Sequence, residues 1–224
     1  MKTIAIVEFG SSARLDSDKY SDRDFFILVE RFDDLEMAIL DLKLKFSYLN
    51  KPNAEFIVND VASFNRMLKN GSLFLWHLKL EAKPVYGSDE FWTRMKNLNA
   101  FTEFESTFYS YLEVLEDLSN ARKKLPTLTH FDYSVLFSVV RNLSILGCYK
   151  LNSPKFGRVS AFKELIKITQ QKSISYSDYI FLMRKKIEYE RGFFDKSDTI
   201  IDIDLLIQKA YTFSNQVKNL LNIE

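Results

Sequence analysis

Short apolar runs and helix-like patterns alternate over the first ninety residues, which predicts a small mixed α/β unit. Strands are expected where compact apolar runs are bounded by polar or turn residues: 3–9, 23–30, 54–58 and a short closing strand at 84–87. Helices are expected between them: a short capped one within 11–19, and longer ones at 35–49, 61–69 and 72–81. The pattern therefore favours a sheet of a few strands with helices packed on it.

The character of the chain changes after Gly87. Five long segments follow with apolar residues at helical spacing and no strand-like alternation: 101–124, 131–151, 158–171, 176–191 and 202–222. Asp132, Ser160 and Ser177 stand at plausible helix starts. We expect a bundle of about five helices, with two domains at 1–90 and 91–224 and the connection within 88–100.

Composition excludes several classes of protein. The chain has 224 residues, 46% of them apolar and 15% aromatic, so one large or two small cores can form. Its 31 basic and 30 acidic residues give a net charge of +1, which predicts no bulk attraction to nucleic acid or membranes and argues against an RNA-tailing enzyme. No run approaches the length of a membrane span. The single cysteine, Cys148, allows no internal disulfide and is expected to be buried, and we expect a cytoplasmic protein.

Candidate chemistry gathers around the first two predicted strands. The first strand ends in the turn Phe9-Gly10-Ser11-Ser12, and Asp22 and Asp24 begin the second. Residues at i and i+2 of a strand point to the same face, so the two aspartates project side by side. A Gly-Ser turn entering a helix offers backbone N–H groups to an anion. The segment therefore predicts a site for a metal-bound polyphosphate.

A third acid completes a cage for one or two Mg²⁺ or Mn²⁺ ions. Glu55 lies on the next predicted strand and is the preferred third ligand, while Asp60 remains an alternative. Asp16 and Asp18 are further candidates that we expect instead to be solvated turn residues.

Other clusters carry weaker signals. His77 and His130 are too far apart in the chain to suggest a dyad or a zinc site. The basic runs 122–124 and 184–186 are typical of solvated helix faces, with contact to a polyanionic acceptor as the alternative.

Residues 1–90 resemble the nucleotidyltransferase superfamily, which includes DNA polymerase beta, kanamycin nucleotidyltransferase and small antitoxin-type enzymes. The resemblance rests on Gly10-Ser11, a gap of about ten residues, Asp22-x-Asp24 before an apolar run, and Glu55 on a later strand. The helical remainder is similar in outline to the helical domain of the kanamycin enzyme or to a HEPN-like bundle. Arg141-Asn142 lies near the place of the HEPN ribonuclease motif, but no histidine follows, which argues against RNA cleavage.

The resemblance implies transfer of a nucleoside monophosphate, AMP from ATP being the expected case, to a hydroxyl of a small molecule, a protein or a tRNA. Asp22, Asp24 and Glu55 would then be the catalytic and metal-binding residues. The nucleotide phosphates would be held by Gly10, Ser11, Ser12 and Arg14, with a surface salt bridge as the alternative role of Arg14. The alternative is a nucleotide-binding interaction protein of the antitoxin or defence type.

Overall fold

A computed structural model of the chain describes residues 2–14, 22–50, 53–125, 129–192 and 201–223. The strands are β1 (Thr3–Phe9), β2 (Arg23–Val29), β3 (Ala54–Asp60) and β4 (Lys83–Tyr86). The helices are α1 (Gly10–Arg14), α2 (Leu35–Lys45), the 3₁₀ turn η1 (Ser47–Leu49), α3 (Val61–Lys69), α4 (Leu73–Glu81), α5 (Ser88–Met95), α6 (Phe104–Lys124), α7 (His130–Lys150), α8 (Ser160–Thr169), α9 (Tyr176–Arg191) and α10 (Ile203–Leu221).

The chain forms two compact units, residues 1–102 and 103–224. The expected boundary at residue 90, within a connection at 88–100, falls inside α5. In the structure, Phe91 and Met95 of α5 are buried in the core of the first unit. The sequence pattern offered no sign of this, because an eight-residue amphipathic helix looks alike in either setting.

The first unit is a four-stranded mixed sheet in the order β3-β2-β1-β4. The β1/β2 and β1/β4 pairs are antiparallel, whereas β2 and β3 are parallel. A parallel pair needs a crossover connection, which α2 supplies. The expected α/β fold, a small mixed sheet followed by an all-helical part, is confirmed.

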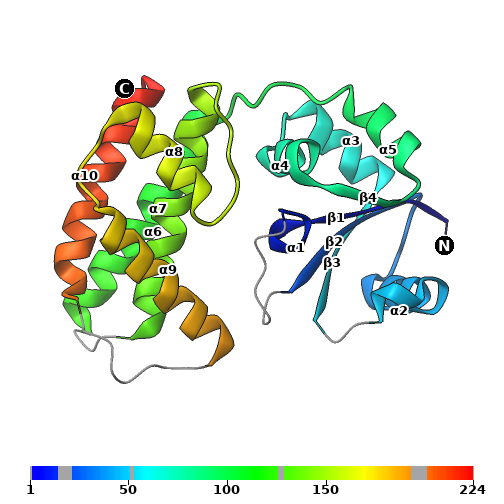
Figure 1. Cartoon of the computed structure of the whole chain (residues 1–224), viewed down its shortest axis with the longest axis horizontal. Helices are drawn as coiled ribbons and strands as arrows, with labels where there is room; N and C mark the ends of the chain where they lie inside the picture. The colour runs from blue at the N-terminus through cyan, green and yellow to red at the C-terminus, as the bar shows by residue number, and fades with distance from the viewer. Residues whose placement is uncertain (1, 15–21, 51–52, 126–128, 193–200, 224) are drawn as a thin grey trace. The chain divides into compact units, whose positions relative to one another are not determined.

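Two cores lie on opposite faces of this sheet, and Figure 1 shows the helices that cover them. On one face, Val7, Phe26 and Leu28 pack against α3, α4 and α5. On the other, Ile6, Phe25 and Ile27 pack against α2 and η1. Both faces of β2 are buried, which explains the unbroken apolar run from residue 25 to 29.

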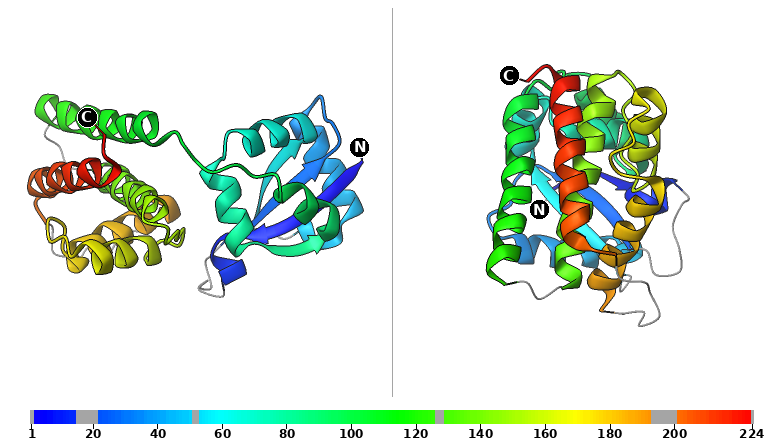
Figure 2. Two further views of the ribbon diagram at one scale, coloured as in Figure 1. Left: turned by 90° about the horizontal axis from the view of Figure 1, so that it is seen from above. Right: turned by 90° about the vertical axis from the view of Figure 1, so that its left-hand side faces the viewer.

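The second unit is built around α7, whose buried residues lie on all sides of the helix. Helices α6, α8, α9 and α10 all contact it, and Figure 2 shows them grouped in one bundle. Cys148 is buried there as expected, and burial raises the pKa of its thiol to about 12. Among the described residues, no helix is both long and apolar enough to cross a bilayer.

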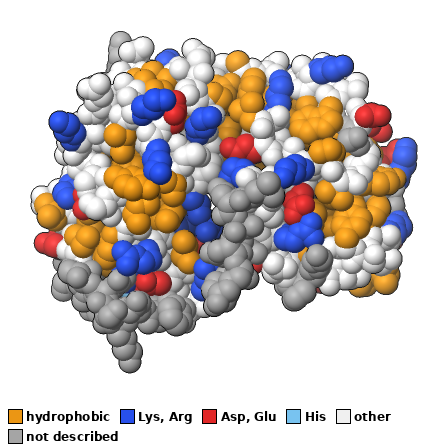
Figure 3. All heavy atoms as spheres, in the orientation of Figure 1, with side chains coloured by type: hydrophobic (Ala, Val, Ile, Leu, Met, Phe, Trp, Pro, Cys, Tyr) orange, Lys and Arg blue, Asp and Glu red, His pale blue; other side chains and the backbone are white. Residues whose placement is uncertain are grey.

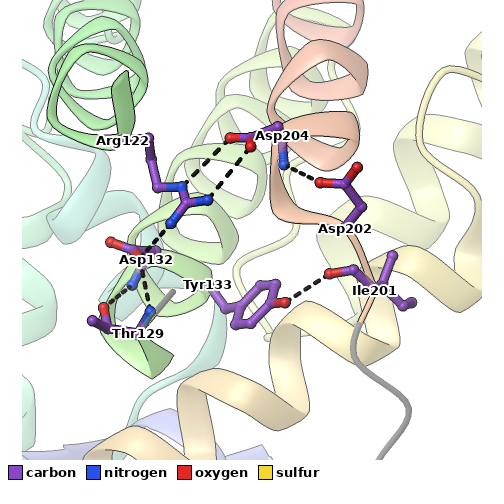
Figure 4. Close-up of polar contacts among 7 residues, drawn as sticks. All are labelled: Arg122, Thr129, Asp132, Tyr133, Ile201, Asp202 and Asp204. Carbon is purple, nitrogen blue, oxygen red and sulfur yellow. Dashed lines mark hydrogen bonds and ion pairs between the residues drawn. The ribbon is translucent and has the colours of Figure 1, made fainter. Parts of the chain in front are cut away.

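Polar side chains join three helix ends in this bundle (Figure 4). Arg122 near the end of α6 lies 4.0 Å from Asp132 of α7 and 3.4 Å from Asp204 of α10. Tyr133 donates a 2.7 Å hydrogen bond to the Ile201 carbonyl. With its side chain only 9% exposed, Arg122 fits neither of the two roles expected for the basic run 122–124.

The basic run 184–186 is likewise not a uniformly solvated face. Lys185 is 4% exposed and forms a 2.8 Å ion pair with Glu188, one turn further along α9. Its ammonium also lies 5.6 Å from the centre of the Phe181 ring. The middle residue of this run is therefore part of the bundle interior.

Candidate nucleotide-transfer site

Strand alternation separates Arg23 from the acids of the predicted site. Arg23 faces the α2 side, where its guanidinium bonds both Glu8 carboxylate oxygens at 2.7 and 2.9 Å. These bonds hold the pKa of Glu8 below its ordinary value. Asp24 alternates with Arg23 and points to the face that α3, α4 and α5 cover.

Asp24 and Glu55 are brought together by the pairing of β2 with β3. They are direct partners in the parallel ladder, so both side chains project on the same face from neighbouring strands. Glu55 is exposed and Asp24 is half-buried. Thirty-one positions separate them in the chain, and the crossover through α2 brings them side by side.

Gly10 lies directly against the Asp24 carboxylate. Its φ of +74° falls in the left-handed region, and a Cβ built on it would overlap the Asp24 Oδ2 atom. Phe9, the residue before it, is the β1 partner of Asp24. The Gly-Ser turn and the strand that carries Asp24 therefore approach each other closely, and this approach requires a glycine at position 10.

Asp22 is exposed and comes just before the first residue of β2. An extended backbone would put it on the same face as Asp24, two positions on. Among the described residues, however, no group of three or more carboxylate, histidine or cysteine side chains is arranged to hold a metal ion. The paired acids Asp24 and Glu55 match a divalent cation in donor type, because Mg²⁺ and Mn²⁺ prefer carboxylate oxygens.

The remaining candidate site residues that the structure describes make local contacts of different kinds. Ser12 donates a 3.3 Å hydrogen bond to the Phe9 carbonyl, which closes the first turn of α1. Asp60 caps α3 by accepting a 2.7 Å bond from the Ser63 N–H, and this bond lowers the pKa of Asp60. Asp16 and Asp18 lie outside the described residues.

Arg14, for which phosphate binding and a salt bridge were both expected roles, contacts an acid of α4. Its guanidinium lies 2.8 Å from Glu81 Oε2, and His77 Nε2 lies 3.1 Å from the same oxygen. All three side chains are at most 19% exposed. Burial acts to raise the pKa of Glu81, but the hydrogen bonds from His77 and Arg14 outweigh it and lower the pKa to about 2.

The network of Arg14, His77 and Glu81 was not predicted. His77 also packs edge-on against Phe9, with ring centres 5.7 Å apart, so the network reaches the residue before Gly10. The i,i+4 spacing of His77 and Glu81 was visible in the sequence. Their link to Arg14, which lies 67 positions before Glu81, depends on how α4 packs and was not visible.

Comparison with known proteins agrees with this fold. No family model matches the chain, and no curated protein matches it. A search of solved structures finds spectinomycin adenyltransferase from Enterococcus faecialis, with ATP and spectinomycin: TM-score 0.50, 12% identity, covering 97% of this chain and 92% of that one. It also finds a nucleotidyltransferase-like protein from Exiguobacterium sibiricum, at TM-score 0.35 and 12% identity, covering 99% of this chain and 69% of that one.

The chain therefore shares the fold of the spectinomycin adenyltransferase over nearly its whole length. The resemblance inferred from Gly10-Ser11 and Asp22-x-Asp24 is confirmed at the level of the fold.

Proposed function

We propose that this protein is a nucleotidyltransferase that moves AMP from ATP to a hydroxyl of a small molecule. One observation carries the proposal: the Gly10 turn lies against Asp24, and Asp24 is paired across the sheet with Glu55. An anion-binding turn touching a pair of acids suits a triphosphate bound together with a cation.

Each residue has a part in this proposal. Asp22, Asp24 and Glu55 would hold Mg²⁺ or Mn²⁺, which when bound offsets the charge of the triphosphate and lowers the pKa of the attacking hydroxyl. The backbone N–H groups of Ser11 and Ser12 would bind phosphate oxygens. Arg14, held by Glu81, would fix α1 rather than contact the nucleotide.

The small-molecule acceptor is supported by the adenyltransferase of the same fold, whose structure contains ATP and spectinomycin. Proteins and tRNA remain acceptors to be tested. A nucleic-acid acceptor is less favoured, because the Lys and Arg side chains on the face in Figure 3 are spread among apolar and acidic ones. In addition, Arg122 and Lys185 are engaged within the bundle.

A second function is favoured by one finding, the lack of a three-acid group suited to a metal among the described residues. A nucleotide-binding interaction protein without turnover needs no such group. This alternative predicts ATP binding without release of pyrophosphate.

Pyrophosphate release separates the two functions. Purified protein is incubated with ATP or another nucleoside triphosphate, Mg²⁺ or Mn²⁺, and a panel of hydroxyl-bearing small molecules, proteins and tRNA. We expect release with at least one small molecule, and a loss of at least about a hundredfold in Asp24→Asn, because the carboxylate that would hold the cation is removed.

Asp33→Asn is the matched control. Asp33 follows the opposite end of β2, and its side chain is 83% exposed, so activity should stay within about twofold. Metal-dependent ATP binding without turnover on any acceptor would favour the interaction protein. No nucleotide binding at all would exclude both functions.

A further inference from the structure

The outward surface of α2 is apolar where a helix of a soluble domain is normally polar. Met37, Leu40 and Leu44 are 61%, 51% and 78% exposed. The opposite side of the helix carries the buried residues Ala38 and Leu42, and Leu42 belongs to the core on the sheet. The α2 face of the sheet is thus already covered, and the outer residues do not contribute to that core.

These three residues form one continuous stripe. Positions 37, 40 and 44 follow the i, i+3, i+7 spacing of a single helix face. We call them the α2 stripe. Three exposed apolar side chains in a row point to contact with another surface, whereas a single one would not.

Along one edge of the stripe, charge is divided between the two ends, while the other edge carries the Asp41–Lys45 ion pair. Glu36 lies near the start of α2 and Lys43 near its end, seven positions apart. Seven residues are close to two helical turns, so both side chains lie along the same edge of the stripe. The Lys43 ammonium lies 5.3 Å from the centre of the Phe56 ring, which keeps it beside the sheet rather than extended into solvent.

A surface with one acidic and one basic end is complementary to itself when it is turned around. If two copies of α2 pack antiparallel about a two-fold axis, Glu36 of each copy meets Lys43 of the other. The apolar residues then pair across the centre, where Leu40 lies nearest the axis. A parallel arrangement would instead place like charges opposite each other.

We propose that the α2 stripe is a dimerisation surface whose partner is a second copy of this chain. The inference is independent of the proposed function, because α2 lies on the face of the sheet opposite to Asp24 and Glu55. The stripe is short, so the interface falls at the small end of known interfaces and the dimer dissociates readily.

The first test is the mass of the full-length protein in solution, measured by sedimentation velocity over a range from about 1 to 200 µM, which suits a small interface. We expect a monomer–dimer equilibrium within this range. Leu44→Glu should weaken dimerisation by at least about tenfold, since it places two charges in an apolar contact. A wild-type protein that is monomeric at every concentration overturns the proposal.

Leu125→Glu is the matched control. Leu125 is 74% exposed, nearly as much as Leu44, but it follows α6 in the other unit. This variant should dimerise like the wild type. An equal loss in both variants, with circular dichroism unchanged, contradicts a dimer formed through α2, and so does a Leu44→Glu protein that still dimerises fully.

A charge exchange tests the antiparallel pairing itself. Glu36→Lys and Lys43→Glu should each weaken self-association about tenfold, because like charges then meet. An equimolar mixture of the two variants should recover dimers. In a mixed dimer the two exchanged positions carry opposite charges and face each other, and the native Glu36 of one copy still meets the native Lys43 of the other. Failure of the mixture to recover dimers overturns the proposed pairing.

Discussion

Single side chains in this protein depend on neighbours that are distant in the sequence. Gly10 is required because Asp24 occupies the space of a Cβ. Glu81 stays ionised because Arg14 and His77 share one of its oxygens. Each of these dependences yields a measurable prediction.

Replacing Gly10 with alanine should cost more than the backbone strain alone. The left-handed φ costs roughly 1 kcal/mol in any L residue, and overlap with Asp24 adds to it. We expect Gly10→Ala to lower the free energy of unfolding by about 2–3 kcal/mol and to weaken ATP binding. Urea denaturation and nucleotide titration measure the two effects.

Gly192→Ala is the control for this prediction. Gly192 has a φ of +63°, but nothing lies within 4 Å of its would-be Cβ. Its variant should show only the strain of about 1 kcal/mol. An equal loss of unfolding free energy in the two variants would mean that the close approach of Gly10 to Asp24 adds nothing to the cost of the substitution.

The Glu81 network predicts a stability that depends on pH. The folded-state pKa of Glu81 is about 2, below its ordinary value of 4.5, so its contribution is present above pH 4.5 and lost as the pH falls towards 2. Glu81→Gln should therefore be less stable than the wild type by about 2 kcal/mol at pH 7. The difference should shrink as the pH falls below the ordinary pKa of 4.5.

Urea denaturation of both proteins from about pH 3 to 7 tests this, because that range spans most of the expected loss. Glu90→Gln serves as a control, because Glu90 is 54% exposed and its pair with Arg94 is a surface pair that contributes little. A difference between Glu81→Gln and wild type that is the same at every pH would argue against the network as its source.

At the scale of elements, periodicity predicted most of the helices and strands, but it missed α5 in the expected connection and did not give where several elements begin and end. Helix α2 ends at Lys45 instead of residue 49, with η1 following. Helices α7 and α9 are capped by Thr129 and Ser175, three and two residues before the expected starts at Asp132 and Ser177. In both capping boxes an aspartate at the third helical position bonds back to the cap.

For the acids of the candidate site, too, the local sequence pattern predicted some features and left others open. Alternation placed Asp24 on one face of β2, and this needed only the local pattern. Whether Glu55 or Asp60 lies beside it depended on the register of β3, which no local pattern determines. In the structure Glu55 pairs with Asp24, whereas Asp60 pairs with Val29 at the other end of the strand.

Substitution of these two acids should separate chemistry from stability. Glu55→Gln removes an exposed charge and should leave the free energy of unfolding within about 0.5 kcal/mol while nucleotide transfer falls at least about tenfold. Asp60→Ala removes the cap of α3 and should cost about 1 kcal/mol, with transfer retained. Thermal denaturation and pyrophosphate release measure the two quantities. The reverse outcome would identify Asp60 as the third acid.

At the scale of the molecule, the chain consists of two units, each with its own buried core. The change of periodicity after Gly87 predicts domains at 1–90 and 91–224, and the first compact unit of the structure ends at Thr102, with Phe91, Met95 and Leu98 in its core. A composition change in a sequence marks where secondary structure changes, and packing decides where a unit ends.

We therefore expect limited proteolysis to cut near the exposed Thr102–Glu103 bond before it cuts within either unit. Fragments of residues 1–102 and 103–224 should persist and be identified by mass spectrometry. Circular dichroism of the isolated fragments should show a mixed spectrum for the first and a helical one for the second. Early cleavage within α5 would show that the first unit ends before Phe91.

The crossover through α2 also has a consequence for the order of folding. The β1/β2 pair closes a short loop and can form early, which brings Asp24 beside Gly10. The β2/β3 pair must close a longer one, since Asp24 and Glu55 are 31 positions apart. Residues of the candidate site would then be assembled at different times, and we expect the pairing of Asp24 with Glu55 to be among the last steps of folding in the first unit.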